Sequence, residues 1–539
     1  MKYLQRYALP VLIVVSIFFA GWVFGHRNGR QLSEGQINFL IGSHMNDKLT
    51  KVVSYIGSDY IEPISQDSLA ELAIPAILEK LDPHSAYLPA REFKQVEEPL
   101  QGEFDGIGVV FNMATDTVII LNVIPSGPSQ KAGILAGDRI IKVNDTLIAG
   151  EKISQTEVMK RLRGPRGTKV DLTLERKDIS EPVVVTVTRD AIPLNSVEAA
   201  MMMTDKVGFI RLSQFARTSF REVKSAVDTL RKQGMTGLIL DLRGNSGGFL
   251  DQAILIANEF LERGKLIVYT EDRHKQRIRQ YSDGTGSATD VDIAVLIDES
   301  SASSSEILAG ALQDNDRGTI IGRRSFGKGL VQSQIPFEDG SALRLTVAKY
   351  YTPTGRSIQK PYTAGDEEGY HMDIVNRYNH NEFFSADSIH FADSLKFTTP
   401  KGKVVYGGGG IMPDIFIPLD TTNMSKYYLE VSGRNILYRY TIEYADAHRR
   451  ELNAAKSLKD LEHMFNADKD MFNRFVSYAA KSGVKPNYKQ IATSRKIMES
   501  QLRAYIARNS EFDSSAFYYF ICPIDNALLT SIKTLENND

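Results

Sequence analysis

The stretch IAVLIDESSASSSEILAGALQD, residues 293–314, decides how the fold of this chain is interpreted. It starts with an apolar run that predicts a strand buried on both faces, continues through a turn of small residues, and becomes helix-periodic from Glu306. A serine in this turn lies at the N-terminus of a helix, where free N–H groups and the helix dipole stabilise a developing negative charge. Serines also cap helices at this position. The stretch by itself therefore leaves nucleophilic catalysis and helix capping both open.

The segments before this stretch alternate between strand and helix patterns. Between residues 208 and 264 the chain contains, in this order, GFIRL, FREVKSAVDTLRKQG, GLILDLR and FLDQAILIANEFLERG. Strands that are apolar on both faces and separated by helices are typical of a parallel sheet covered by helices. We therefore expect an α/β core over residues 191–420. An insertion within it, at about residues 363–402, is interpreted as an exposed loop excursion.

The rest of the chain divides into three further regions. Residues 31–97 are helix-periodic. Residues 98–190 contain short alternating apolar runs separated by turn signals, which predict a compact β-rich domain. Residues 421–539 are charged and helix-periodic without a chemical motif, so they could brace the core, mediate self-association or bind an adaptor protein. The sequence thus predicts a multidomain α/β protein with a helical C-terminal region.

The N-terminus contains the most apolar segment of the chain. Residues 8–25, ALPVLIVVSIFFAGWVFG, are 18 residues without a charge, and Lys2 and Arg6 precede them. A helix of this length is about 27 Å long, enough to cross a hydrocarbon core. Basic residues before the span favour a cytoplasmic N-terminus. We expect residues 1–30 to anchor the chain in a bacterial inner membrane, with its body in the periplasm; a cleaved signal peptide is the alternative.

Composition excludes several classes of protein. The chain has 539 residues, with 64 Lys and Arg against 66 Asp and Glu, a balance that argues against a nucleic-acid-binding protein. Its single cysteine, Cys522, excludes an intrachain disulfide and a zinc site built of thiolates.

A serine nucleophile needs a base, and none of the nine histidines offers a convincing partner. A lysine serves instead when burial lowers its pKa toward neutral pH. Lys328 is the candidate because glycines on both sides permit close backbone approach, although a solvated surface lysine is the ordinary alternative. Residues 322–328 also match the start of a phosphate-binding loop. We reject that reading because Gly329 replaces the Mg²⁺-binding hydroxyl and strand patterns follow.

A glycine-rich turn, GNSGG at residues 244–248, follows the strand GLILDLR. Its glycines can turn the backbone so that N–H groups face a substrate carbonyl, or they can simply form a tight strand-to-helix turn. Asp241 and Arg243 at the end of the strand are expected to form a structural ion pair that braces this turn.

Ten motifs between Leu81 and Asp414 occur in the order known from one protein family. They are LDPHSAYL, GIGVVF, SGPSQKAGILAGDRIIKVN, LRGPRGTKV, IRLSQF, LILDLRGNSGG, SSASSSEILAGALQD, GRRSFGKGLVQ, KYYTPTGRSIQ and GGGGIMPD. The chain resembles the C-terminal processing (tail-specific) serine proteases, which carry an inserted PDZ domain. The resemblance implies a PDZ domain at residues 98–190 and a ClpP/crotonase-like protease core at residues 191–420, with no metal or cofactor.

The resemblance also implies catalytic roles. Ser303 matches the nucleophile, Lys328 the general base, and Gln332 the glutamine that orients the lysine. One departure concerns the glycine-rich turn, where Ser246 occupies a position that is commonly proline in the family.

The oxyanion hole implied by the resemblance consists of main-chain amides. These map to Gly247 or Gly248 and to Ser304. Ser304 is a second departure, because alanine is common there, but only its N–H is required.

The PDZ domain is implied to bind the free C-terminus of a protein or peptide substrate by strand addition beside Gly106-Ile107-Gly108-Val109. Arg163 and Arg166, in LRGPRGTKV, are candidates for reporting this binding to the core, with ordinary surface arginines as the alternative. An inactive PDZ adaptor that binds C-termini is the second functional class considered. The complete set of Ser303, Lys328 and Gln332 counts against it.

Overall fold

The computed structural model describes residues 47–115, 117–177 and 179–537, and the chain divides into two compact units, Met1–Ile77 and Leu78–Asp539. In the first unit the described residues form α3 (Asp47–Asp59) and most of α4 (Gln66–Leu78). The predicted membrane anchor at residues 1–30 lies outside the described residues. None of the helices that the structure describes is long and apolar enough to cross a membrane.

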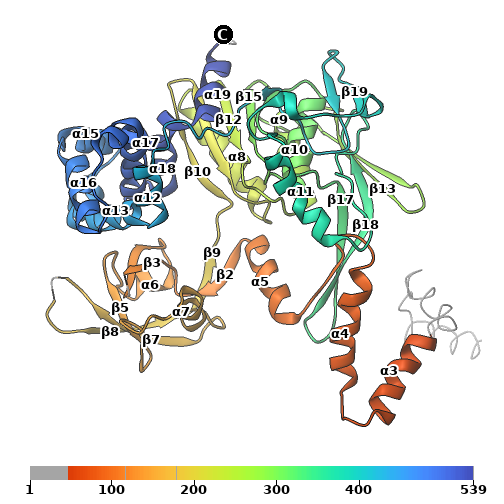
Figure 1. Ribbon diagram of the computed structural model, residues 1–539, viewed down its shortest axis with the longest axis horizontal. Coiled ribbons are helices and arrows are strands. Elements are labelled where there is room, and N and C mark those ends of the chain that lie inside the picture. Colours follow the sequence, from red (N-terminus) through yellow and green to blue (C-terminus); the bar gives the residue numbers. More distant parts are fainter. Residues whose placement is uncertain (1–46, 116, 178, 538–539) are drawn as a thin grey trace, which may run out of the picture. The chain divides into compact units, whose positions relative to one another are not determined.

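The second unit contains a six-stranded sheet whose strands lie in the order β10-β11-β12-β15-β16-β21. Strands β10, β12 and β15 of this sheet are labelled in Figure 1. Their bounds are β10 (Val197–Met202), β11 (Val207–Leu212), β12 (Gly237–Asp241), β15 (Asp292–Ile297), β16 (Gly318–Gly322) and β21 (Ile415–Phe416). All neighbouring pairs from β11 to β21 are parallel, and β10 is antiparallel to β11. The predicted α/β core with a parallel sheet is therefore confirmed.

Helices cover both faces of this sheet. On one face, Leu238 and Leu240 of β12 pack with α8 (Ser219–Lys232), α9 (Leu250–Phe260) and α10 (Ser304–Asp314). On the other face, Ile239 of the same strand packs with Leu528 and Leu535 of α19 (Asn526–Glu536). The end of the described chain thus belongs to the α/β core. Helix α19 therefore braces the core, which is one of the three roles considered for the C-terminal region.

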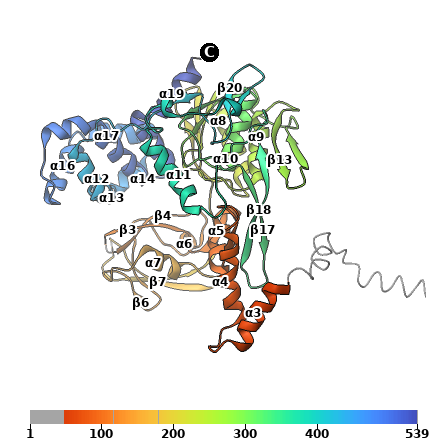
Figure 2. The ribbon, with the colours of Figure 1, turned by 45° about the vertical axis from the view of Figure 1, so that its right-hand side comes forward.

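A second sheet consists of antiparallel strands (Figure 2). Its members are β1 (Ala86–Leu88), β13 (Leu266–Asp272), β14 (Arg277–Tyr281), β17 (Leu330–Pro336) and β18 (Ala342–Tyr351). Strand β18 pairs with β1, β13 and β17, so it brings the LDPHSAYL segment beside the segment that follows Lys328.

Residues 109–188 form the predicted β-rich domain. It contains β3 (Val109–Thr115), β4 (Thr117–Val123), α6 (Pro128–Lys131), β5 (Arg139–Val143), β6 (Thr146–Leu147), α7 (Gln155–Leu162), β7 (Lys169–Glu175) and β8 (Val183–Thr188). Its strands pair in the order β3-β4-β5-β7-β8, with β6 paired to β5. The chain enters through α5 (Ala90–Gln101) and β2 (Glu103–Gly106), and it leaves through β9 (Asp190–Pro193), which pairs with β2.

The C-terminal region is helical, as predicted, and has an apolar core of its own. Its helices are α12 (Lys426–Gly433), α13 (Ile436–Ala447), α14 (Arg449–Ala454), α15 (Leu458–Ala467), α16 (Met471–Lys481), α17 (Tyr488–Ala507), α18 (Asp513–Ile521) and η4 (Cys522–Ile524).

The insertion at residues 363–402 is structured, so the prediction of an exposed loop excursion is wrong. It contains α11 (Glu367–Asn379), η2 (Ala386–Ser388), η3 (Asp393–Leu395) and β19 (Lys396–Thr398), which pairs with β20 (Val404–Tyr406). Tyr370 and Arg377 of α11 are only 3% and 4% exposed. Arg377 donates hydrogen bonds of 2.7 and 3.0 Å to the carbonyl oxygens of Arg324 and Ser325. These contacts hold α11 against the segment that leads to Lys328.

Candidate active site

Ser303 is the N-cap residue of α10, in the turn that follows β15. Its backbone has φ 56° and ψ −113°, a conformation that a residue with a side chain adopts only when its surroundings enforce it. Strain of this kind is concentrated at functional positions in proteins. Ser303 is partly exposed, whereas the neighbouring residues Ala302 and Ser304 are buried.

Three of the other four serines in the turn have structural partners for their hydroxyls, and the fourth, Ser300, is exposed. Each of the three donates its hydroxyl to a carbonyl oxygen of the segment around the glycine-rich turn: Ser301 to Leu242 at 2.8 Å, Ser304 to Gly248 at 2.9 Å and Ser305 to Asn245 at 2.8 Å. Within the described residues, no carbonyl of this segment accepts the hydroxyl of Ser303. The Ser303 oxygen instead faces the backbone of Glu306 in a capping box, so unlike those three serines Ser303 does not donate its hydroxyl proton to this segment.

The glycine-rich turn lies directly against Ser303. Gly247 has φ 104°, and a Cβ at this position would lie 2.8 Å from the Cβ of Ser303 and 3.0 Å from the backbone nitrogen of Ser304. The N–H of Gly247 donates a 2.9 Å hydrogen bond to Oδ1 of Asn245. No acceptor for the N–H of Gly248 is found among the described residues. Of the two glycines implied by the resemblance, Gly248 therefore has the available amide.

Lys328 follows β16 in a loop that packs closely on the rest of the core. A Cβ on Gly327 would lie 3.1 Å from the backbone nitrogen of Gly410, and one on Gly329 would lie 2.9 Å from that of Gln359. Burial lowers the pKa of the Lys328 ammonium to about 8, and the charge of Arg344 acts in the same direction. A substantial fraction of Lys328 is therefore neutral near pH 8, which a surface lysine would not be.

Glu306 joins the serine turn to the lysine loop. Its side chain is fully buried, and Oε2 accepts 2.9 Å hydrogen bonds from the backbone N–H groups of both Ser303 and Lys328. Oε1 accepts the N–H of Gly327 at 2.7 Å and the hydroxyl of Ser325 at 2.5 Å. Burial raises the pKa of Glu306 to about 7, against these four donors, which favour the carboxylate.

Tyr350 makes a second connection between the same two residues. Its hydroxyl lies 3.2 Å from the carbonyl oxygen of Ser303 and 2.5 Å from that of Lys328. The side chain is 1% exposed, and burial raises the pKa of the phenol well above its usual value. The hydroxyl thus stays protonated and can donate to these carbonyls. The backbones of Ser303 and Lys328 are fixed relative to each other from both sides.

Gln332 lies on β17, opposite Thr346 of β18. Its Nε2 is 3.4 Å from Oγ1 of Thr346, which in turn donates a 2.9 Å hydrogen bond to Oδ1 of Asp82. No hydrogen bond joins Gln332 to Lys328, or Lys328 to the hydroxyl of Ser303, in the part of the chain that the structure describes. The structure thus places Gln332 in a chain of polar groups that ends at Asp82.

His84 lies near the lysine. Its Nε2 is 2.9 Å from the hydroxyl of Tyr370 on α11. Burial, together with the charge of Lys328, lowers the pKa of His84 to about 4, so the imidazole is neutral at neutral pH. The LDPHSAYL segment therefore contributes to the surroundings of Lys328. The sequence did not indicate this contact, because the segment lies in a region that is otherwise helix-periodic.

The predicted ion pair at the end of β12 is confirmed. Arg243 donates from Nη2 to Oδ2 of Asp241 at 2.7 Å and from Nε to Oδ1 at 3.0 Å. The carboxylate is fully buried, and the charges of Arg243 and Arg211 hold its pKa below the usual value, although burial opposes them.

The segment Gly106-Ile107-Gly108-Val109 leads into β3, which lies at the edge of its sheet. One side of this strand is therefore not paired within the sheet. Gly108 has φ 75°, and a Cβ on it would lie 3.0 Å from Cδ1 of Ile192. The segment is thus tightly turned and leads to an edge strand, the arrangement that strand addition needs.

Arg163 and Arg166 contact the segments that connect the β-rich domain to the core. Arg163 lies 3.2 Å from Glu98 of α5, with its guanidinium 4.3 Å from the ring centre of Phe104. Arg166 lies 3.1 Å from Glu103 and from Asp105. Neither arginine contacts the residues around Ser303 in the described structure.

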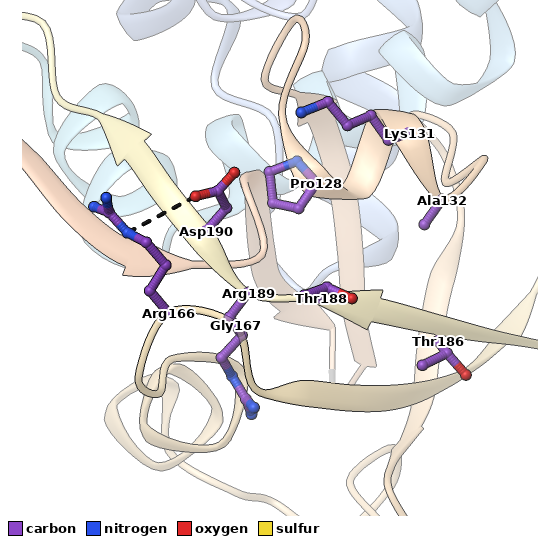
Figure 3. Close-up of a pocket in the computed structure, with 9 residues that line it drawn as sticks. All are labelled: Pro128, Lys131, Ala132, Arg166, Gly167, Thr186, Thr188, Arg189 and Asp190. Atoms are coloured by element: carbon purple, nitrogen blue, oxygen red, sulfur yellow. Dashed lines mark ion pairs between the residues drawn. The ribbon is translucent and has the colours of Figure 1, made fainter.

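A cavity of about 500 Å³ opens between α6 and the end of β8 (Figure 3). Lys131, Thr188 and Arg166 line it, and Nε of Arg166 is 3.8 Å from Oδ1 of Asp190 across its rim. The cavity is polar and is lined by other residues than the Gly106–Val109 segment. Pro128, which also lines the cavity, lies beside Gly108 of that segment.

Comparison with known proteins identifies the family. Family models match peptidase family S41 over residues 206–368, a PDZ domain over residues 106–190 and a family of unknown function over residues 427–510. The carboxy-terminal-processing protease of Bartonella bacilliformis is 40% identical over 309 residues, which are 56% of this chain and 70% of that protein. The chain belongs to this family. It is a C-terminal processing serine protease with a PDZ domain.

Two further relatives of the protease are similar over comparable lengths. Carboxy-terminal processing protease CtpA of Bacillus subtilis is 35% identical over 327 residues, 60% of this chain and 69% of that protein. The solved photosystem II D1 C-terminal processing protease is 26% identical, with a TM-score of 0.36, and the match covers 69% of this chain and 86% of that one.

Sequence reasoning missed several residues of the site. Glu306 carried a detectable signal, because a glutamate three residues after an N-cap serine is the pattern of a capping box. Tyr350, Asp82 and Asn245 lie within the motifs that carry the resemblance, but their roles could not be inferred, because their partners lie on other strands and loops that only the folded chain brings together.

Proposed function

We propose that this protease is an endopeptidase that cleaves proteins and peptides with a Ser303–Lys328 dyad after its PDZ domain has bound their free C-termini. The observation that supports the proposal is a strained, partly exposed serine and a partly buried lysine of lowered pKa, whose backbones share Glu306 and Tyr350 as hydrogen-bond partners. A binding module has no need for this arrangement.

The proposed reaction has two halves. Neutral Lys328 accepts the proton of the Ser303 hydroxyl as Oγ attacks the carbonyl carbon of the scissile bond. The lysine ammonium then gives this proton to the departing amine, and an acyl-enzyme ester remains on Ser303. In the second half, Lys328 takes a proton from water, the resulting nucleophile attacks the ester, and Ser303 regains its proton.

Each attack passes through a tetrahedral intermediate with a negatively charged oxygen. We assign the stabilisation of this oxyanion to the backbone N–H groups of Gly248 and Ser304. Ser304 is the first residue of α10, so its N–H has no acceptor within the helix and lies at the positive end of the helix dipole. The hydrogen bond from Ser304 Oγ to the carbonyl oxygen of Gly248 holds the two donors together.

Substrate binding is assigned to the edge of β3, next to Gly106-Ile107-Gly108-Val109. In this proposal, ligand binding moves the PDZ domain, and Arg163, which contacts α5, transmits the movement. Gln332 then orients Lys328 toward Ser303. We further propose that residues 1–30 anchor the chain in a bacterial inner membrane and that the protease acts in the periplasm.

Cleavage of an unstructured protein tests the proposal. Wild-type protein and the variants S303A and K328A are incubated with the substrate, with and without a peptide that has a free apolar C-terminus. Cleavage by the wild type alone, stimulated by the peptide, is expected. Peptide binding without cleavage by any of the three proteins would favour the PDZ adaptor instead, and activity of S303A would contradict the choice of nucleophile.

A further inference from the structure

The start of α19 contacts the active-site segment through one carboxylate. Asp525 is the N-cap of this helix, and its Oδ1 accepts the N–H groups of Ala527 at 3.0 Å and Leu528 at 3.1 Å. The same carboxylate pairs with Arg243: Oδ1 lies 3.1 Å from Nη1 and Oδ2 lies 2.8 Å from Nη2. One side chain thus caps the helix and binds an arginine more than 280 positions earlier in the chain.

Arg243 immediately precedes the glycine-rich turn. Its guanidinium lies between two carboxylates, Asp241 at the end of β12 and Asp525 at the start of α19. The side chains of Arg243 and Asp525 are 21% and 17% exposed, so water screens this pair only in part. Both carboxylates raise the pKa of Arg243, against its burial, so the guanidinium remains charged.

The turn that Arg243 begins carries the proposed oxyanion donor. From Gly244, which donates to Asp298 at 2.9 Å, the backbone runs to Gly247, which lies against Ser303, and then to Gly248. A shift of Arg243 is therefore passed to the Gly248 amide over a short segment of backbone. Misplacement of a catalytic group by about 1 Å costs on the order of 100-fold in rate.

We infer that Asp525 is a positioning residue for the oxyanion hole: through Arg243 it fixes the end of β12 from which the glycine-rich turn starts. The inference rests on the proposed function. It assigns a catalytic contribution to a segment outside residues 206–368, which the peptidase family model matches. In this protease the last described helix therefore does more than cover the sheet.

The variant D525N tests this inference in the full chain. Asparagine caps helices as well as aspartate does, so the substitution retains the cap and removes the charge pair. We expect kcat to fall about 10-fold, with KM within about 2-fold, because the oxyanion forms only after substrate has bound. Modification of Ser303 by a fluorophosphonate, whose phosphoryl oxygen occupies the oxyanion position, should slow by a similar factor. D525E, which restores the carboxylate, should recover most of the rate.

Two control variants separate this effect from general loosening. D290N breaks the pair between Arg231 and Asp290, 2.6 Å apart and before the amino end of β15, far along the strand from Ser303. N526A removes the 3.0 Å hydrogen bond from Asn526 to Asp420 at the start of α19 and leaves Arg243 paired. Both should retain the wild-type kcat and labelling rate.

Thermal unfolding of every variant shows whether it is folded at the assay temperature. A kcat of folded D525N within 2-fold of wild type, or an equal loss in N526A, would overturn the inference. D525S, which also retains an N-cap residue without the charge, is a second variant of the same kind. Failure of both D525N and D525S to fold would also overturn the inference, because the pair of Asp525 with Arg243 would then serve folding and not the oxyanion hole. A wild type that neither cleaves nor reacts with the fluorophosphonate would instead refute the proposed function, and this inference with it.

Discussion

The carboxylate of Glu306 accepts the backbone N–H of Ser303 at 2.9 Å, and in doing so holds the serine in its positive-φ conformation. The same oxygen accepts the N–H of Lys328. The positions of both members of the proposed dyad thus depend on one buried side chain that itself contacts no substrate. Such an arrangement lets the serine turn and the lysine loop, which come from different strands, keep one relative geometry.

The substitution E306Q should disrupt this arrangement. An amide group presents two N–H donors where the structure has only donors, so some of these polar groups become unsatisfied. We expect a loss of about 1–3 kcal/mol in the free energy of unfolding and a fall of kcat of at least about 100-fold. Denaturant unfolding and steady-state kinetics measure both. E299Q, which weakens the pair of Glu299 with Arg323, is the control; equal kinetics of the two variants would contradict the role of Glu306.

The pH dependence of kcat/KM should report the proton on Lys328. Because the base is neutral only above its pKa, activity should rise with pH through about 8. The charge of Asp82 raises this pKa, so D82N should move the rising limb to lower pH. T346V retains the Asp82 carboxylate but removes the Thr346 hydroxyl through which Gln332 is linked to it. It should lower kcat without moving the rising limb of the pH profile. A limb that stays in place in D82N would refute the electrostatic contribution of Asp82.

Replacing the lysine should stabilise the protein. Burial of the Lys328 ammonium lowers its pKa from 10.5 to about 8, so the folded state binds this proton more weakly than the unfolded state. The cost is fully present below pH 8 and disappears as the pH rises toward 10.5. K328M should therefore be inactive but more stable than wild type at pH 7, by roughly 1–3 kcal/mol. Chemical unfolding at pH 7 and pH 10 tests this; a gain independent of pH would point to packing alone.

A methyl group on Gly247 should abolish activity. In G247A, the new Cβ would approach the Cβ of Ser303 to 2.8 Å and the carbonyl oxygen of Ala302 to 2.9 Å, and the backbone has φ 104°. G264A is a matched control, because Gly264 also has positive φ, 82°, but nothing lies within 4 Å of the added atom. It should cost only about 1 kcal/mol of stability and retain activity. Similar activity in both variants would show that the turn tolerates a shift.

The sequence was sufficient to predict the elements that depend on local patterns. The apolar strand before Asp298, the helix from Ser304 and the turn of small residues between them follow from hydrophobic periodicity and turn chemistry. The choice of Ser303 among neighbouring serines came from resemblance to a family. Part of its physical basis, the hydrogen bonds from the hydroxyls of Ser301, Ser304 and Ser305 to carbonyl oxygens, became visible only in the folded chain.

Contacts between distant segments could not be predicted in this way. The prediction for the insertion failed because its polar composition masks two buried anchors, Tyr370 and Arg377, whose partners lie elsewhere in the chain. The contact between Gln332 and Thr346 depends on the register of β17 and β18, which sequence periodicity does not determine. In the sequence, Asp525 has only the pattern of an ordinary N-cap. Its contact with Arg243 is seen only in the fold, where α19 packs beside β12.

The closure of the central sheet by α19 has a consequence for biosynthesis. The ribosome releases the strands from Val197 to Gly322 long before residues 526–536. The sheet face that contains Ile239 therefore remains without its covering helix while the rest of the chain is translated. Until α19 arrives, Arg243 also lacks its second carboxylate. With the role inferred for Asp525, a nascent protease completes its oxyanion hole only after this last described helix has been synthesised.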